Sequence, residues 1–323
     1  MRTRHWLIAI LAGSLSGFAA TASAAAQTKV VVSIKPLHAL VASVMAGVGT
    51  PDLLVKGAAS PHTYAMKPSD AKALNGADLF FRMSESVEPF TIKVVRALSK
   101  RVTVVTLQDA PDMKLLPRRT SSTFEAHVHE AAKGGHGKHD HDHDDGKKTD
   151  APDGHAWLDP DNAKAMVDRI EQALSAKYPA NATAFKTNAQ KLSADIDALD
   201  KELAGKLKPI AGKPYIVFHD AFQYLEDHYD LNAVGSISIS PDVPPSAKRL
   251  SELRKKVVSL AAVCVFAEPQ HDTRLVQNLV EGTSARTGTL DAEALSLEPG
   301  PDLYFAMMRR LADDLKGCLA PQA

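Results

Sequence analysis

Long apolar runs, an excess of charge of one sign and basic stripes mixed with aromatic side chains are all missing from this chain of 323 residues. Lysines and arginines number 38, as do aspartates and glutamates, so the formal charge is balanced at neutral pH. The basic residues are scattered, and we therefore expect no nucleic-acid partner. The apolar stretch from Trp6 to about Ala20 is too short for a typical membrane span, and no later stretch is long enough either.

That N-terminal stretch has the pattern of a secretory signal peptide. Arg2, Arg4 and His5 precede the apolar run, and small residues follow it around Ala22 to Ala24. We predict a cleaved signal peptide over residues 1–26 and a mature chain of roughly 300 residues, large enough for two lobes. The stretch has no cysteine, which argues against a bacterial lipid anchor. We expect a protein that is free in a periplasm or secreted.

Cysteine is scarce throughout the chain. Cys264 and Cys318 are the only two cysteines. An exported protein folds in an oxidising compartment, so we predict that they form a disulfide, with two free buried thiols as the alternative. In the chain-entropy description, closing a loop of this size stabilises the fold by about 4 kcal/mol.

Apolar residues are almost absent between Glu125 and Asp153, where histidine, carboxylates, glycine and lysine dominate. Such a segment cannot bury enough apolar surface to offset the entropy of ordering it, so residues 125–153 are predicted to form a mobile loop. Imidazole and carboxylate are ligands of first-row divalent ions, which predicts weak, accessory metal binding. A solvated charged linker is the alternative. The six histidines of this segment are His127, His129, His136, His139, His141 and His143.

The rest of the chain alternates strand-type apolar runs with helical patterns. This alternation predicts an α/β fold of two lobes, each with a mostly parallel sheet flanked by helices. We place the N-terminal lobe at residues 27–180 and the C-terminal lobe at 208–323. The expected strands lie at 30–34, 52–55, 78–83, 102–107, 215–220, 233–238, 261–269 and 287–292.

A long helix is predicted between the lobes, over residues 181–207. Its apolar residues recur at helical spacing, and about 27 residues of helix span about 40 Å. A helix of this length is able to join two lobes rigidly, whereas a surface helix on one lobe is the alternative. The apolar positions are Phe185, Leu192, Ile196, Leu199 and Leu203.

Three histidines outside the histidine-rich segment have informative surroundings. His62 follows an expected strand in a loop of small residues, His155 precedes a helix, and His219 ends the strand YIVF. Ligands of open α/β sheets bind beyond the carboxyl ends of strands, which is where His62 and His219 are expected. We predict that the three side chains form one metal site.

Two acidic residues also follow expected strands. Asp291 is a candidate carboxylate ligand, and capping of the following helical segment is its equal alternative. Glu268 is a candidate group for orienting a ligand imidazole. Three neutral imidazoles with one oxygen suit tetrahedral Zn²⁺, whereas Mn²⁺ takes more carboxylate oxygen.

Four motifs of the chain carry a family resemblance. PHTYAMKPSD, DGHAWLDP, YIVFHDAF and CVFAEPQ, with the histidine-rich insertion before the second, resemble the zinc-specific solute-binding proteins of bacterial high-affinity zinc ABC importers. The resemblance covers nearly the whole mature chain. It implies two αβ lobes joined by a long rigid helix, with the metal in the cleft between them.

The resemblance also implies particular residues. By motif position, the family's zinc-binding histidines correspond to His62 and His155 in the first lobe and to His219 in the second, and its cysteine pair resembles Cys264 and Cys318. Some members have a glutamate directly before the first histidine, where this chain has Pro61. Asp291 or a water molecule is then expected as the fourth ligand.

The function that follows is high-affinity capture of Zn²⁺ in the periplasm by a monomer that is not an enzyme. Delivery to an ABC importer permease, powered by a cytoplasmic ATPase, is implied. A zinc hydrolase with three histidines is the main alternative, although the sequence lacks HExxH, and Glu268 is its candidate base. A manganese-binding protein or an adhesin of the same architecture is the other alternative.

Overall fold

A computed structural model describes residues 28–119, 124, 151–238, 246–259 and 261–321. The predicted signal peptide, residues 125–150 of the histidine-rich segment and its six histidines lie outside these residues. The predictions made for them therefore stay predictions.

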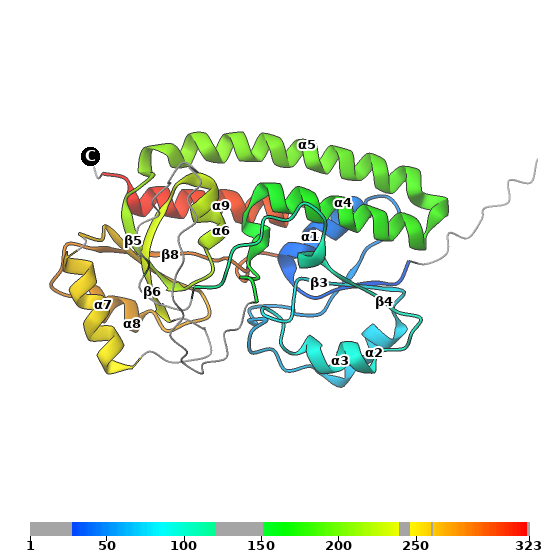
Figure 1. Cartoon of the computed structure of the whole chain (residues 1–323), viewed down its shortest axis with the longest axis horizontal. Helices are drawn as coiled ribbons and strands as arrows, with labels where there is room; N and C mark the ends of the chain where they lie inside the picture. The colour runs from blue at the N-terminus through cyan, green and yellow to red at the C-terminus, as the bar shows by residue number, and fades with distance from the viewer. Residues whose placement is uncertain (1–27, 120–123, 125–150, 239–245, 260, 322–323) are drawn as a thin grey trace, which may run out of the picture.

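Two four-stranded parallel sheets form the framework of the molecule (Figure 1). The first has the strand order β2-β1-β3-β4 and the second the order β6-β5-β7-β8, so the two sheets repeat one topology. Every predicted strand is present, and the prediction of two α/β lobes is confirmed. The strands are β1 (Val30–Val32), β2 (Asp52–Leu53), β3 (Leu79–Arg82), β4 (Thr103–Thr106), β5 (Pro214–His219), β6 (Asn232–Ser238), β7 (Cys264–Ala267) and β8 (Arg286–Thr289).

The two inner strands of each sheet, β1 and β3 or β5 and β7, are buried on both faces, which explains why they are mainly apolar runs. Side chains alternate between the faces of a strand, so Val31 lies in one apolar cluster while Val30 and Val32 lie in another. In the same way, Ile216 and Tyr215 of β5 belong to different clusters.

Separate helices cover the outer faces. Apolar side chains beside α2 and α3 complete the cluster on the first sheet, and those of α7 and α8 complete the one on the second. These helices and α6 are α2 (Pro68–Gly76), α3 (Thr91–Ala97), α6 (Gln223–Tyr229), α7 (Ala247–Ser259) and α8 (Arg274–Val280). Short 3₁₀ turns are η1 (Leu107–Asp109), η2 (Ala156–Leu158), η3 (Pro179–Asn181) and η4 (Lys208–Ile210).

The inner faces of both sheets meet one shared helical layer. It consists of α1 (Lys35–Val44), α4 (Pro160–Lys177), α5 (Ala182–Leu207) and α9 (Leu303–Leu319). Figure 1 shows α5 running along most of the molecule, with α9 beside it on the side of the second lobe. A single apolar cluster contains side chains of this layer and of both sheets. The lobes are thus joined by a common core as well as by a connecting helix.

Helix α5 is the long helix predicted at residues 181–207, and it has 26 residues. Its five predicted apolar positions are all buried. They form one stripe along the helix because apolar residues three or four apart share a face.

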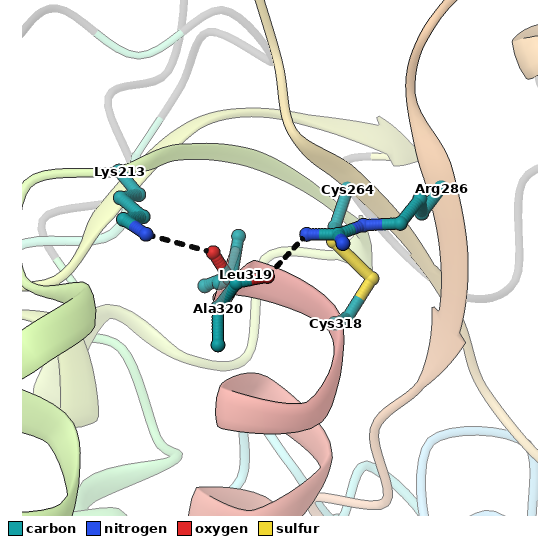
Figure 2. Close-up of a disulfide and its surroundings, with 6 residues drawn as sticks. All are labelled: Lys213, Cys264, Arg286, Cys318, Leu319 and Ala320. Carbon is teal, nitrogen blue, oxygen red and sulfur yellow. Dashed lines mark hydrogen bonds between the residues drawn. A yellow bond between two sulfur atoms is a disulfide. The ribbon is translucent and has the colours of Figure 1, made fainter. Parts of the chain in front are cut away.

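A disulfide ties the shared layer to the second sheet (Figure 2). It joins Cys264 of β7 to Cys318 in the last turn of α9, so the disulfide prediction is confirmed. The carbonyls at the end of α9 accept hydrogen bonds from Lys213 Nζ and Arg286 Nη2, at 3.0 and 2.8 Å. These cations lie at the negative end of the helix dipole, where they stabilise the terminus.

Among the described helices, none has the length and apolar character needed to cross a membrane.

Candidate metal centre

The three predicted histidines come together between the two lobes. His219 ends β5, His62 lies in the loop between β2 and α2, and His155 directly precedes η2. The Nε2 atom of His155 lies 3.3 Å from Nε2 of His62 and 3.4 Å from Nε2 of His219. Ligand atoms of all three residues lie within 4.8 Å of one another. We call these residues the histidine group.

The position of His219 follows from the strand order. In the second sheet, β5 and β7 are the neighbours from which the chain leaves in opposite directions, to β6 and to β8. Open α/β sheets bind ligands at this point, beyond the carboxyl ends of the strands. Glu268 comes directly after β7 and lies at the same edge.

Carboxylates contact the Nδ1 atoms of two of the imidazoles. Asp153 Oδ1 lies 2.7 Å from Nδ1 of His155, and Glu268 Oε1 lies 2.5 Å from Nδ1 of His219. When each carboxylate oxygen accepts the Nδ1 proton of its imidazole, Nε2 is the ring atom that remains to bind a cation, after it has lost any proton of its own. The Nε2 atoms of His155 and His219 face each other and are the atoms that an ion would contact.

The spacing of these nitrogen atoms matches that of a tetrahedral zinc site. Zn–N bonds of about 2.0–2.1 Å place two nitrogen corners of a tetrahedron about 3.3–3.4 Å apart. The two separations of 3.3 and 3.4 Å within the histidine group agree with this value. The group has the donor type and the geometry for one divalent ion of the zinc type.

Asp291 does not join the histidine group. Its Oδ1 accepts the backbone N–H of Leu295 at 2.8 Å, and its Oδ2 accepts the N–H and hydroxyl of Ser296 at 2.9 and 2.7 Å. These are the contacts of a capping side chain, which was the alternative interpretation of this residue. The group of close ligand atoms found among the described residues contains the three histidines and neither Asp291 nor Glu293.

Glu293, which sequence reasoning missed, is the carboxylate that faces the group. Its Oε1 lies 3.4 Å from Nε2 of His62 and accepts a hydrogen bond from Ser60 Oγ at 3.3 Å. Its Oε2 is buried and has no hydrogen-bond partner within the described parts of the chain. A buried carboxylate oxygen that has no hydrogen-bond partner is available to bind a cation. If no cation binds, the unpaired buried oxygen lowers the stability of the fold.

The turn that carries Glu293 is fixed from the first lobe. Lys35 of α1 is buried, and its Nζ donates hydrogen bonds to the carbonyls of Ala294, Leu295 and Leu297, at 3.2, 2.9 and 2.7 Å. Together with the Asp291 cap, these bonds set where Glu293 points. Sequence patterns gave no signal for this, because Lys35 and Glu293 are more than 250 positions apart.

Comparison with known proteins assigns the chain to a family. The family model described as zinc-uptake complex component A, periplasmic (ZnuA), matches residues 30–318. The chain belongs to the ZnuA family. A relative from Brucella suis biovar 1 (strain 1330), named high-affinity zinc uptake system protein ZnuA, is 42% identical over an alignment of 334 residues that covers 99% of this chain and 100% of the relative.

Solved structures share the fold of this ZnuA family member. A crystal structure of ZnuA has a TM-score of 0.74 at 21% identity, over 91% of this chain and 100% of that one. A mutant of the laminin-binding adhesin Lmb from Streptococcus agalactiae has a TM-score of 0.71 at 22% identity, over 90% and 98%. The same architecture thus occurs in proteins with different names. The fold alone therefore does not identify the function, and the residues of the site are needed for that.

The imidazoles of the site differ in proton affinity. Burial lowers the pKa of His62 well below its usual value, and the neighbouring His155 and His219 lower it further. Burial also lowers the pKa of His219, but the charge and hydrogen bond of Glu268 outweigh it and raise this pKa to about 9. Burial raises the pKa of Glu293 to about 8. Protons and a metal ion therefore compete for the same atoms.

A second group of possible ligand atoms is already paired internally. Asp159, Asp161 and His228 also have atoms within 4.8 Å of one another. The two ring nitrogens of His228 contact Asp159 Oδ1 at 3.0 Å and Asp200 Oδ1 at 2.9 Å. These ion pairs link elements of the structure, and we assign no metal to them.

Proposed function

We propose that this protein captures Zn²⁺ with high affinity in the periplasm and delivers it to the membrane permease of an ABC importer, which a cytoplasmic ATPase powers. The observation that carries the proposal is the convergence of three imidazoles, with His155 Nε2 at the spacing of a tetrahedral zinc site from Nε2 of both His62 and His219. Membership of the ZnuA family supports the same role.

His62, His155 and His219 are the proposed protein ligands, and a carboxylate or a water molecule occupies the fourth position. The contacts favour Glu293 over the predicted Asp291, since both Asp291 oxygens accept backbone hydrogen bonds while Glu293 Oε2 has no partner among the described residues. Such a carboxylate would neutralise part of the ion's charge and close the shell.

A hydrolase is the weaker proposal. Catalytic zinc needs an open position and a base that is free to take a proton from water. Glu268 was the candidate base, but its Oε1 binds His219 and its Oε2 accepts a hydrogen bond from Gln270 Nε2 at 2.7 Å. Both oxygens are therefore engaged in holding the imidazole.

The donor set also favours zinc over manganese. Manganese sites in proteins carry mainly carboxylate and carbonyl oxygen, whereas imidazole nitrogen suits zinc. In this chain, the residue at the end of β5 is a histidine. The nearby carboxylates of Asp153 and Glu268 each contact the Nδ1 atom of an imidazole. An adhesin role has no feature of the site to support it.

The histidine-rich segment is proposed as an accessory that binds zinc weakly. Each ligand it offers has to be ordered as the ion binds, and this entropy cost lowers its affinity relative to a preorganised site. His127, His129, His136, His139, His141 and His143 would supply its donors.

Titration calorimetry with a competing chelator tests the proposal. We expect wild-type protein to bind one Zn²⁺ tightly and further ions weakly. His219→Ala and His155→Ala should each weaken the tight site by more than about 100-fold, because removal of outer partners alone costs about 10- to 100-fold. Tight binding should also weaken at acid pH as protons occupy the imidazoles.

Two matched variants serve as controls. His228→Gln removes a partly buried histidine outside the histidine group and should keep the tight site. Deletion of residues 125–150 should keep it as well and remove the weak sites. Unchanged affinity in His219→Ala would refute the ligand assignment, and a single class of site in the wild type would refute the accessory role.

A further inference from the structure

A tyrosine hydroxyl of the second lobe holds the stretch of chain directly before His155. Tyr224 belongs to α6, and its hydroxyl donates a hydrogen bond to the carbonyl of Asp153 at 2.7 Å. The same oxygen accepts the backbone N–H of Leu116 at 3.1 Å. One side chain therefore binds two stretches of backbone that are 37 positions apart in the sequence.

Those two stretches pair with each other beside the tyrosine. Asp153 donates its N–H to the carbonyl of Leu116 at 2.9 Å, and Pro117 and Pro152 form an isolated antiparallel bridge. In the sequence, one of these two stretches comes before the histidine-rich segment and the other lies at its C-terminal end. Tyr224 joins both stretches to the second lobe.

A short path leads from this hydroxyl to the site. Asp153 Oδ1 accepts both the backbone N–H of His155 at 3.0 Å and a hydrogen bond from its Nδ1 at 2.7 Å. The position of the Asp153 backbone thus sets the position of its carboxylate, and the carboxylate sets the orientation and tautomer of the imidazole. A shift at Asp153 moves the Nε2 atom that faces the other histidines.

We propose that Tyr224 is a positioning residue for metal binding, which acts on His155 through Asp153. The inference rests on the proposed zinc site and adds to it a residue from α6 that lies outside the ligand set.

Other contacts would keep the segment folded without this hydroxyl. Trp157 donates its indole N–H to the carbonyl of Ala292 at 3.0 Å, and Tyr304 donates its hydroxyl to the carbonyl of Trp157 at 3.0 Å. These bonds fix the chain after His155, whereas Tyr224 fixes it before His155. Loss of the hydroxyl should therefore loosen the imidazole more than the fold.

Burial makes the hydroxyl effective. The Tyr224 side chain is fully buried, and burial raises its pKa, so the phenol remains a hydrogen-bond donor across the neutral range. In the dry interior, removing this oxygen leaves the Leu116 N–H and the Asp153 carbonyl without their partner. The aromatic ring itself would remain in Tyr224→Phe.

The chain offers a matched control in Tyr215. This tyrosine of β5 is also fully buried, and its hydroxyl has no hydrogen-bond partner among the described residues. Tyr215→Phe removes the same atom from an equally buried ring without releasing a backbone group. The two variants thus differ mainly in the contact under test.

Zinc affinity of the full chain should be measured at neutral pH for wild type, Tyr224→Phe, Tyr215→Phe, His155→Ala and the double variant Tyr224→Phe/His155→Ala. We expect Tyr224→Phe to weaken binding by about 10-fold, the lower limit for the loss of an outer partner. Tyr215→Phe should stay within about 2-fold of the wild type. In the His155→Ala background, Tyr224→Phe should have no further effect, because the hydroxyl acts through His155.

Replacing zinc by Co²⁺ gives a second measurement, which reports on the geometry of the ligands and not on the stability of the fold. The visible absorption of bound Co²⁺ depends on the geometry of its ligands, so Tyr224→Phe should alter the band positions or intensities while Tyr215→Phe leaves them unchanged. Equal affinity and equal spectra in Tyr224→Phe and wild type would overturn the inference about Tyr224 and leave the proposed function standing. An effect of equal size with and without His155 would also overturn it. Absence of tight zinc binding by wild-type protein would instead refute the proposed function on which it rests.

Discussion

Gly154, directly before His155, shows how closely single residues define the site. A Cβ atom built on Gly154 would lie 2.4 Å from Val87 Cγ2, 2.7 Å from Ser86 Oγ and 2.8 Å from Ser84 Oγ. Contacts this short do not occur between real side chains, so either the turn after β3 or the segment with His155 has to move. Glycine allows the metal-binding segment to approach the first lobe at this point.

We predict that Gly154→Ala weakens zinc binding by about 10-fold, because displacement of Gly154 also displaces Asp153 and His155. Competition titration against a chelator measures the change. Gly76→Ala is the control, since a Cβ at Gly76 meets nothing within 4 Å. If Gly154→Ala bound zinc as tightly as Gly76→Ala, the close packing would have no bearing on the ligand.

At the scale of elements, one histidine connects three helices. His228 of α6 contacts Asp159, which caps α4, and Asp200, which lies within α5. Burial lowers the pKa of His228, but the hydrogen bonds to Asp159 and Asp200 outweigh it and raise the pKa to about 9. The protonated imidazole therefore stabilises the junction between the second lobe and the shared helical layer.

This raised pKa predicts a stability difference that depends on pH. A histidine with a folded-state pKa above its unfolded value of 6.5 contributes fully below about pH 6.5, and the contribution disappears as the pH rises through 9. Since the side chain is partly exposed, we expect His228→Gln to lose only about 1 kcal/mol of unfolding free energy near pH 6. The loss should vanish above pH 9.

Urea unfolding of wild type and His228→Gln from pH 6 to 10, with chelator present to remove metal, measures this difference. His219 titrates in both proteins, so its contribution cancels in the comparison. A difference that stayed constant over the whole range would show that the ion pairs with Asp159 and Asp200 contribute no net stability.

At the scale of the whole molecule, the shared helical layer makes the two lobes one body. A single apolar cluster includes side chains from both sheets and from α1, α4, α5 and α9. The disulfide fastens the end of α9 to β7 across 54 positions of sequence (Figure 2). Removing it loosens the layer on the side of the second lobe.

Replacing Cys264 and Cys318 together by alanine should lower the unfolding free energy by about 4 kcal/mol, the entropy value for a loop of this length. Zinc stoichiometry should not change, because neither sulfur belongs to the histidine group. Denaturant unfolding and zinc titration test the two statements, and reduced wild-type protein provides an independent comparison. Loss of the zinc site in the double variant would show that the disulfide also supports the ligands.

Local patterns of the sequence were sufficient to predict the elements. Apolar runs such as YIVF and the helical spacing of Phe185, Leu192 and Ile196 predict strands and a helix because burial on one face repeats with the period of the element. The position of His62 and His219 after expected strands led us to place them at one site, because ligands of open sheets bind beyond the carboxyl ends of strands. The structure brings both of them close to His155, while their role as ligands stays a prediction. Asp153 was also within reach of sequence reasoning, two residues before His155.

Tertiary structure alone decided which groups complete and support the site. Asp291 and Glu293 are two positions apart, and sequence patterns do not show which one caps a turn and which one faces the imidazoles. Lys35, which comes from the first lobe, donates hydrogen bonds to the carbonyls of this turn, a contact that exists only after folding. The role inferred for Tyr224 likewise depends on a hydroxyl that meets Leu116 and Asp153 only after folding. Periodicity is a local property of the chain and can be seen in the sequence, whereas contacts between distant residues exist only in the folded molecule.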